Sequence, residues 1–330
     1  MQPPYLLFLG DVGDQLAAKT AHGILEWRRT WCLGQLRLPG CKADLGLPEL
    51  SPAEARARGA RTMIVAVANS GGVLAEHWVS TIVTALEAGL DVASGLHQRL
   101  GDFPAIAAAA ARCGRTLTDV RHPKQRFKTG TGVRRPGKRL LTVGTDCSCG
   151  KKYTALAIER EMRARGWKAD FRATGQTGIM IAGEGVAIDA VVADFISGAV
   201  EWLTPANDPD HWDVIEGQGS LFHPAFAGVS LGLLHGAQPD ALVLCHEPTR
   251  RHMRGLPQQP LPSLEDCIEL NLRCARLTNP DVRLVGLSIN TANLPEGERE
   301  DYLARLSAEY GLPAVDPIAT GVAPIVDRLP

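Results

Sequence analysis

The chain has 330 residues, of which 45% are hydrophobic and 22% are charged, and its formal net charge is −1. This composition is ordinary for a globular protein, and the length allows two domains, each with its own core. A nearly neutral chain lacks the positive charge that attracts nucleic acid in bulk, so we expect no nucleic-acid partner.

The first residues, MQPPYLLFLGDVGD, carry no positive side chain, and Gly10 and Asp11 interrupt their apolar run. Such a start is typical of neither a signal peptide nor a membrane span, so we expect a cytoplasmic protein without a membrane partner. The eight cysteines include no CxxC pair. This spacing favours reduced thiols over a disulfide framework or a zinc site, and we expect no metal ligands.

The first half of the chain alternates strand-like and helix-like segments. Apolar, β-prone runs predict strands at Tyr5–Leu9, Thr62–Ala68, Asp91–Ser94 and Thr116–Val120. Between them, helical spacing of apolar residues predicts helices at Gln15–Trp31, Trp78–Ala88 and Pro104–Cys113. Strands that alternate with helices form parallel sheets, so we expect a Rossmann-like domain over residues 1–137.

The segment Arg121–Arg139, RHPKQRFKTGTGVRRPGKR, is basic and contains several Pro and Gly residues. This composition is typical of a solvated connector, so we place the domain boundary here. The first domain then ends in a basic linker at residue 137, and the second covers residues 138–330. Because these charges precede a phosphate-binding motif, some of them are also candidates for holding a polyphosphate.

Residues 140–166 predict a strand, a glycine loop and a helix. Leu140–Val143 is a β-prone run, GTDCSCGKK follows, and apolar residues recur at helical spacing from Tyr153. The N–H groups at the start of such a helix attract an anion, and Lys151 adds a positive charge. We predict cofactor contacts from ten consecutive residues: Gly144, Thr145, Asp146, Cys147, Ser148, Cys149, Gly150, Lys151, Lys152 and Tyr153.

This loop departs from the common P-loop pattern in two ways. Five residues separate Gly144 from Gly150 where the common pattern has four, and Lys152 stands where a Ser or Thr would hold Mg²⁺. Thr154 is the only nearby hydroxyl that could substitute. The longer GTD…GK form resembles the loop of dethiobiotin synthetase and its P-loop relatives, which implies a P-loop NTPase-like, parallel-sheet α/β domain.

Further strands of the second half end in polar residues, and ligands of open α/β sheets bind at such ends. The motifs are TGQTG at 174–178, EGQGS at 216–220 and CHEPTRRHMR at 245–254. Guanidinium groups suit carboxylate or phosphate capture, although a solvated basic loop remains the alternative for the last motif. We predict substrate contacts from these amide, hydroxyl and guanidinium groups: Gln176, Thr177, Gln218, Ser220, Arg250, Arg251 and Arg254.

The segment Trp212–Leu221 resembles the second acidic motif of the dethiobiotin-synthetase-like proteins, which implies that Glu216 faces phosphates and metal. The VGLSIN segment resembles the end of those folds that binds the nucleotide base, so Asn290 is a candidate for adenine contact.

With these motifs, and with LCHEPTR and EGQGSLFHPAFAGVSLGLLHGAQPDA in particular, nearly the whole chain resembles the DgcN-type N-acetyltransferase family. The resemblance implies transfer of the acetyl group of acetyl-CoA to the amino group of D-glutamate or a related D-amino acid, a step of D-amino-acid catabolism. The P-loop would then hold the diphosphate of coenzyme A, and the three arginines would take the substrate carboxylates.

Acetyl transfer needs a base for the substrate ammonium and a donor for the oxyanion. His246, Glu216 and His223 are the candidates, in that order. An acetylated Cys147 or Cys149 is a further alternative, because a P-loop lowers the pKa of a nearby thiol.

Two other functions remain open. One is a Mg-ATP-dependent ligase or small-molecule kinase similar to dethiobiotin synthetase, in which Glu216 and Asp146 would coordinate Mg²⁺. The other is a nucleotide-sensing protein without turnover. In each case we expect a homo-oligomer.

Overall fold

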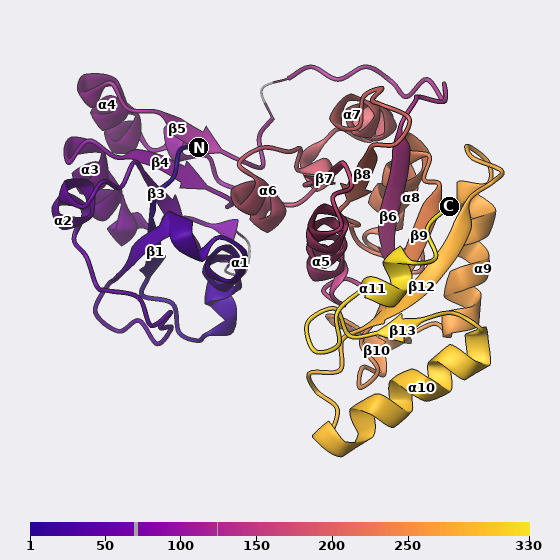
Figure 1. Ribbon diagram of the computed structural model, residues 1–330. Helices are drawn as coiled ribbons and strands as arrows, with labels where there is room; N and C mark the ends of the chain where they lie inside the picture. The colour runs from indigo at the N-terminus through magenta and orange to yellow at the C-terminus, as the bar shows by residue number, and fades with distance from the viewer. Residues whose placement is uncertain (69–71, 124) are drawn as a thin grey trace. The chain divides into compact units, whose positions relative to one another are not determined.

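Two parallel sheets form the framework of the chain, which the computed structural model describes over residues 1–68, 72–123 and 125–330 (Figure 1). Two units follow from the packing. Unit 1 comprises Met1–Lys124 and Gln176–Ala187, and unit 2 comprises Gln125–Gly175 and Ile188–Pro330. The expected α/β fold, with a Rossmann-like first half and a P-loop second half, is confirmed.

The sheet of unit 1 has the strand order β2-β1-β3-β4-β5, and all its pairs are parallel. The strands are β1 (Tyr5–Gly10), β2 (Cys32–Arg37), β3 (Thr62–Val65), β4 (Asp91–Ser94) and β5 (Leu117–Asp119). The helices are α1 (Lys19–Trp27), α2 (Pro52–Ala57), α3 (Val79–Glu87), α4 (Pro104–Cys113) and α6 (Gln176–Ala182), with 3-10 turns η1 (Leu16–Ala18), η2 (Arg29–Trp31), η4 (Glu76–Trp78) and η5 (Leu100–Asp102).

The four predicted strands of unit 1 are present, but β2 and α2 were not predicted. Strand β2 has a weak signal because it contains Gly34 and the polar Gln35. A side chain at Gly34 would overlap Leu50, so the strand needs glycine there. Helix α2 begins with a capping box, in which Ser51 and Glu54 satisfy each other's backbone N–H groups.

The sheet of unit 2 has the order β13-β12-β9-β6-β8-β7, again with parallel pairs. The strands are β6 (Lys138–Gly144), β7 (Ala169–Arg172), β8 (Trp212–Ile215), β9 (Ala241–His246), β12 (Arg283–Ile289) and β13 (Ala314–Val315), beside a separate antiparallel pair of β10 (His252–Met253) and β11 (Leu256–Pro260). The helices are α5 (Lys151–Ala164), α7 (Ile196–Leu203), α8 (Ala227–Ala237), α9 (Leu264–Ala275), α10 (Arg299–Tyr310) and α11 (Ala323–Val326), with 3-10 turns η6 (Ile188–Ala190), η7 (Ala193–Phe195) and η8 (Glu296–Glu298).

Strand β6 lies in the interior of this sheet, between β8 and β9. Helix α5 packs against β6, β7 and β8, while α8 packs against α7 and α9 (Figure 1). Because the strands are parallel, the residues that follow β6, β8, β9 and β12 share one edge of the sheet. The P-loop, Glu216, His246 and Asn290 therefore come together at that edge.

The division into units differs from the predicted boundary at residues 137 and 138. The basic segment packs with unit 2, because Arg134 donates hydrogen bonds to Asn279 (2.6 Å) and Asp240 (2.7 Å). Arg135 donates to the carbonyl oxygens of Thr204 and Gly236, both at 2.8 Å. This part of the segment is therefore a fixed element of unit 2 and not a solvated linker.

Helix α6 is the second difference, since it belongs to unit 1 although its residues follow β7 in the chain. It packs against α1, where the hydroxyls of Thr177 and Thr20 lie 3.2 Å apart.

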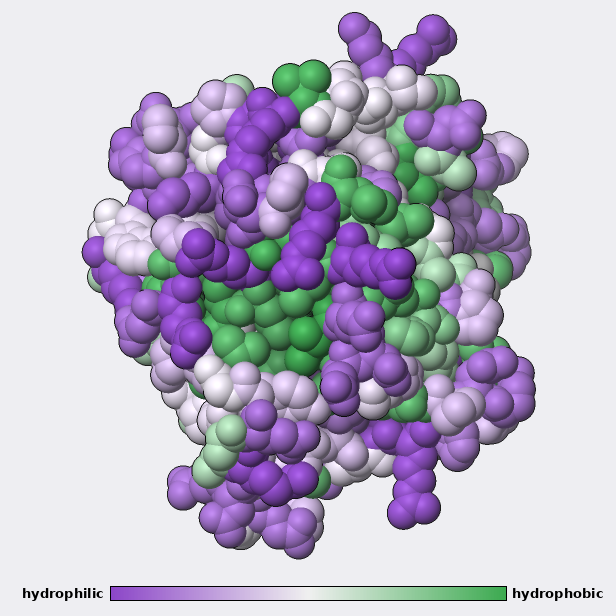
Figure 2. Space-filling view, turned by 90° about the vertical axis from the view of Figure 1, so that its right-hand side faces the viewer, coloured by the Kyte–Doolittle hydropathy of each residue, from purple (hydrophilic) through white to green (hydrophobic). Residues whose placement is uncertain are grey.

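The face shown in Figure 2 carries an apolar area surrounded by hydrophilic side chains. Exposed large hydrophobic residues of unit 2 include Phe226 and Leu231, next to and within α8, which reads AGVSLGLLHGA. A helix that is apolar on all sides is usually buried on all sides, and large exposed apolar areas are typical of interfaces.

Within the described ranges, no helix combines the length and apolar character needed to cross a membrane.

Candidate functional site

The loop between β6 and α5 has the backbone of a P-loop. Gly150 has a φ of 114°, and Ser148 has a φ of 52°, which is uncommon outside glycine. Gly150 is the N-cap of α5 and has no side chain, so the N-terminus of this helix faces the loop with its positive dipole end. A non-glycine residue in the left-handed conformation, such as Ser148, costs roughly 1–2 kcal/mol and is typical of ligand-binding loops.

Lys151, the first residue of α5, places its charge inside the loop. Its side chain is largely buried, and Nζ donates to the carbonyl oxygen of Asp146 at 2.7 Å. A second contact joins Nζ to Cys149 Sγ at 3.6 Å. The ammonium group and the helix N-terminus thus direct positive potential at the same loop, as phosphate binding requires.

Asp146 is fully buried in the P-loop, and both its carboxylate oxygens accept hydrogen bonds. Oδ1 accepts from the Cys147 N–H (2.7 Å), and Oδ2 accepts from Arg250 (2.5 Å) and from the Arg254 N–H (2.8 Å). Burial opposes ionisation, but these donors outweigh it and lower the pKa of Asp146. The carboxylate is therefore ionised and bound by protein donors.

Arg250 fastens the P-loop to the segment after β9. In addition to Asp146, its guanidinium group donates to the carbonyl oxygens of Cys147 (2.7 Å) and Ser148 (3.2 Å). The predicted arginine trio is therefore divided, because Arg250 holds the loop while the side chains of Arg251 and Arg254 are exposed.

Glu216, directly after β8, is buried and lies opposite the turn that precedes α6. Its Oε2 accepts from the N–H groups of Thr174 (3.0 Å) and Gly175 (3.1 Å). Burial raises the pKa of Glu216, and the charge of Lys152 and the two N–H donors oppose the increase. This arrangement gives a carboxylate that accepts a proton more readily than an exposed one.

The EGQGS segment lies against the end of β6. The Gly217 N–H donates to Thr142 Oγ1 at 2.9 Å, and a side chain at Gly217 would overlap the carbonyl oxygen of Thr142. Gln218 donates to the Thr174 hydroxyl at 3.0 Å, and the hydroxyl of Ser220 accepts from the N–H of Phe222 at 3.3 Å. Both Gln218 and Ser220 line a small cavity that reaches the residues of β6.

His246 ends β9 and lies beside the P-loop, with its Nδ1 3.1 Å from the hydroxyl of Thr145. Burial lowers the pKa of His246 to about 4. The imidazole is therefore neutral near pH 7 and a weak base. Asn290, which follows β12, donates its N–H to the carbonyl oxygen of His246 at 2.8 Å, so it shares this edge.

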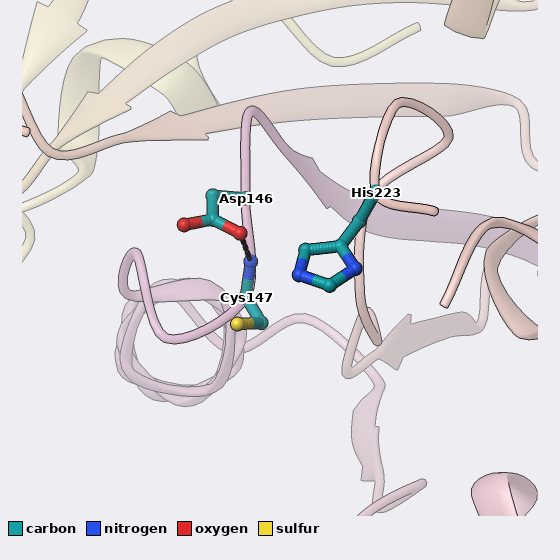
Figure 3. A group of neighbouring side chains, drawn as sticks. All are labelled: Asp146, Cys147 and His223. Atoms are coloured by element: carbon teal, nitrogen blue, oxygen red, sulfur yellow. Dashed lines mark hydrogen bonds between the residues drawn. The ribbon is translucent and has the colours of Figure 1, made fainter. Parts of the chain in front are cut away.

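His223 reaches the P-loop from the segment after β8. Its side chain is buried, and its ring stacks on Phe226 at a centroid distance of 4.4 Å. Ligand-type atoms of His223, Asp146 and Cys147 lie within 4.8 Å of one another, and Figure 3 shows the imidazole edge turned toward the other two residues. These residue types bind metals, but the oxygens of Asp146 already accept three hydrogen bonds, which does not favour a metal ion.

The remaining predicted residues lie elsewhere. Gln176 and Thr177 belong to α6 of unit 1, whereas the other predicted site residues belong to unit 2. The hydroxyl of Thr154, predicted as a substitute magnesium ligand, donates to the Gly150 carbonyl oxygen at 3.1 Å and lies 2.7 Å from Ser288 Oγ. This hydroxyl is buried within unit 2 and is not offered to a metal.

The sequence interpretation missed the two threonines that position the acidic segment. Thr142 binds the Gly217 N–H, and Thr174 donates its hydroxyl to the carbonyl oxygen of Glu216 at 2.5 Å. The available signal was a polar residue in the otherwise apolar run LLTVG, because a buried hydroxyl needs a partner.

Comparison with known proteins agrees with this architecture. Residues 36–123 match the model of a Rossmann-like domain of unknown function, DUF1611_N, and residues 126–326 match the P-loop domain DUF1611_C. A crystal structure of a DUF1611 family protein from Anabaena variabilis is 31% identical, with a TM-score of 0.88 and 99% coverage of both chains.

Two curated relatives share this full length. A protein of Tritonibacter scottomollicae is 56% identical and one of a Pseudoalteromonas species is 52% identical, each over 100% of this chain and 99% of the relative. Both are named D-glutamate N-acetyltransferase. By domain matches, fold and full-length identity, the chain belongs to the DUF1611 family.

Proposed function

We propose that the protein transfers the acetyl group of acetyl-CoA to the amino group of D-glutamate. The observation that carries the proposal is full-length identity of 56% and 52% to two proteins with that name. The name implies an acyl donor, and coenzyme A contains a diphosphate. The P-loop of unit 2, with Lys151 at the start of α5, suits that group.

The polar contacts of the loop support a donor that is bound without being cleaved at its phosphates. A kinase or ligase needs carboxylate or hydroxyl ligands for Mg²⁺. Here both oxygens of Asp146 and one oxygen of Glu216 accept protein N–H groups, and Thr154 is bonded within unit 2. Acetyl transfer leaves the diphosphate intact, so it makes no such demand. In this proposal Asn290 contacts the adenine.

For the amino acid, we propose that the exposed guanidinium groups of Arg251 and Arg254 attract the two carboxylates of glutamate. Arg250 contributes indirectly, because it fixes the loop that carries Asp146.

The reaction also needs a base, because an ammonium group cannot attack a thioester. Among the predicted candidates, Glu216 suits this role best, since burial raises its pKa above the ordinary value of a carboxyl group and makes it a stronger base. His246, whose burial lowers its pKa to about 4, is a weaker base and fits the neutral lining of the donor site.

A thiol-release assay tests the proposal. Purified protein is incubated with acetyl-CoA and D-glutamate, and free coenzyme A is measured with a thiol reagent. L-Glutamate and a sample without amino acid are the controls, and a parallel reaction with Mg·ATP is assayed for ADP. We expect thiol release that depends on D-glutamate. ADP formation in place of thiol release would support the ligase or kinase. If neither free thiol nor ADP is formed, enzymatic acetylation is contradicted.

We also propose that the protein is a homo-oligomer, because α8 is a mostly apolar helix that exposes the apolar side chain of Leu231. The chain mass is 35.4 kDa, so light scattering distinguishes a monomer from a dimer. A monomeric mass at micromolar concentration would contradict the proposal. The cytoplasmic location expected from the sequence stays a prediction.

A further inference from the structure

His223 has a buried nitrogen without a hydrogen-bond partner. The side chain is 2% exposed, and within the described part of the chain no group bonds to its Nε2. A buried polar atom left unpaired costs roughly 1–3 kcal/mol, so such atoms are rare away from ligand sites. A ligand that bonds to Nε2 would remove this cost.

The other ring nitrogen determines which atom carries the proton. Nδ1 of His223 accepts a hydrogen bond from the Ala225 N–H at 3.2 Å, so Nδ1 presents a lone pair. In a neutral imidazole the proton then lies on Nε2, which becomes a donor. The stack on Phe226 holds the ring in this orientation.

The donor is aimed at the P-loop. His223 lies within reach of Asp146 and Cys147, and Figure 3 shows its ring between the segment that carries it and these two loop residues. The same loop carries Lys151 and leads into the N-terminus of α5. A neutral N–H, an ammonium group and backbone N–H groups thus gather at one loop, and all of them are donors.

Two other roles for this group conflict with the same proton position. A metal ion needs a lone pair on Nε2 and free oxygens on Asp146, whose Oδ1 and Oδ2 both accept N–H groups. A nucleophilic Cys147 needs a base, but a protonated Nε2 cannot accept the thiol proton. Burial and the charge of Asp146 also raise the pKa of Cys147, which disfavours its thiolate.

We infer that His223 is a phosphate ligand: its Nε2–H donates a hydrogen bond to an oxygen of a diphosphate held by the loop 144–152, and it is not the base of the transfer. The inference deepens the proposed function, because it assigns to His223 the recognition of the diphosphate of the acetyl donor. It does not depend on the acetyl group, since any molecule with a diphosphate would make the same contact.

Calorimetric titration with inorganic pyrophosphate, in the presence of EDTA, tests the contact itself. His223→Phe keeps a ring for the stack on Phe226 but removes the donor, and we expect its Kd to rise about tenfold or more. His223→Gln retains an N–H donor and is expected to bind nearly as tightly as the wild type. Lys151→Met, which removes the loop charge, is the positive control for lost binding.

The inference is wrong if His223→Phe binds pyrophosphate like the wild type, if His223→Gln loses as much affinity as His223→Phe, or if the wild type does not bind pyrophosphate. Should the variants fail to fold, nitrogen NMR of the wild-type histidines decides. We expect the His223 proton on Nε2 and a shift of that resonance with pyrophosphate, whereas a proton on Nδ1 would refute the assignment.

Turnover separates this inference from the proposed function. With acetyl-CoA and D-glutamate, His223→Phe is expected to raise KM for acetyl-CoA while kcat changes little, and a base would show the opposite pattern. If the wild type binds pyrophosphate through His223 but releases no thiol, the acetyltransferase proposal fails and the phosphate-ligand role stands.

Discussion

The buried imidazole of His246 makes a quantitative prediction about the pH dependence of stability. Burial lowers its pKa from 6.5 to about 4 in the folded protein. The unfolded chain therefore binds this proton near pH 6.5, while the folded chain binds it only near pH 4. Between these values the unfolded state carries more protons, so the stability contributed by His246 is present above about pH 6.5 and is lost as the pH falls.

Linkage gives the magnitude. With these two pKa values, acidification from about pH 8 to about pH 5 should remove about 2 kcal/mol of unfolding free energy, and about 3 kcal/mol is lost below pH 4. The group is largely buried beside the Thr145 hydroxyl, so solvent screening reduces this figure little. A change of 2 kcal/mol is a substantial part of the stability of an ordinary domain.

Urea unfolding of the wild type and of His246→Asn over this pH range is the assay. Asparagine places an amide near the position of Nδ1 but does not titrate, so the difference between the two proteins isolates His246 from every other group. We expect the wild type to lose about 2 kcal/mol more than the variant between about pH 8 and about pH 5. Parallel losses, or a pKa near 6.5 for His246 in an NMR titration, would refute the reasoning.

Three other variants test the site. Gly217→Ala places a methyl group against a carbonyl oxygen of β6 and should destabilise unit 2 by roughly 1–3 kcal/mol in urea unfolding, whereas Gly228→Ala, which meets no atom within 4 Å, should not. Arg250→Lys removes the guanidinium group that bonds to Asp146 and Cys147, so KM for acetyl-CoA should rise about tenfold. An unchanged KM would contradict the proposal that Arg250 fixes the P-loop. Cys147→Ser and Cys149→Ser should each keep turnover near that of the wild type, because burial raises the pKa of Cys147; loss of turnover with intact folding would instead support an acetyl-cysteine.

The sequence was informative where the signal was local. A strand, a glycine loop and a helix follow one another within residues 138–164, so the P-loop could be predicted from neighbouring residues. The parallel order then brought Glu216, His246 and Asn290 to the same edge, as the rule for ligands at strand ends predicts.

Long-range contacts explain what the sequence did not reveal. The acceptors of Arg135 lie 69 and 101 residues away along the chain, so the sequence near Arg135 does not reveal them. The basic segment therefore had the composition of a linker although the fold holds it in place. Arg250 meets Asp146 across 104 residues, and no local pattern distinguishes it from Arg251. The proton position on His223 depends on one N–H donor, that of Ala225, which only the fold positions.

A crystal structure with bound coenzyme A tests the central claim most directly. We expect the diphosphate against the N–H groups at the start of α5, with Lys151 Nζ turned to a phosphate oxygen and away from the Asp146 carbonyl, which it contacts at 2.7 Å here. Coenzyme A bound at another part of the chain, with Lys151 still on that carbonyl, would contradict the account.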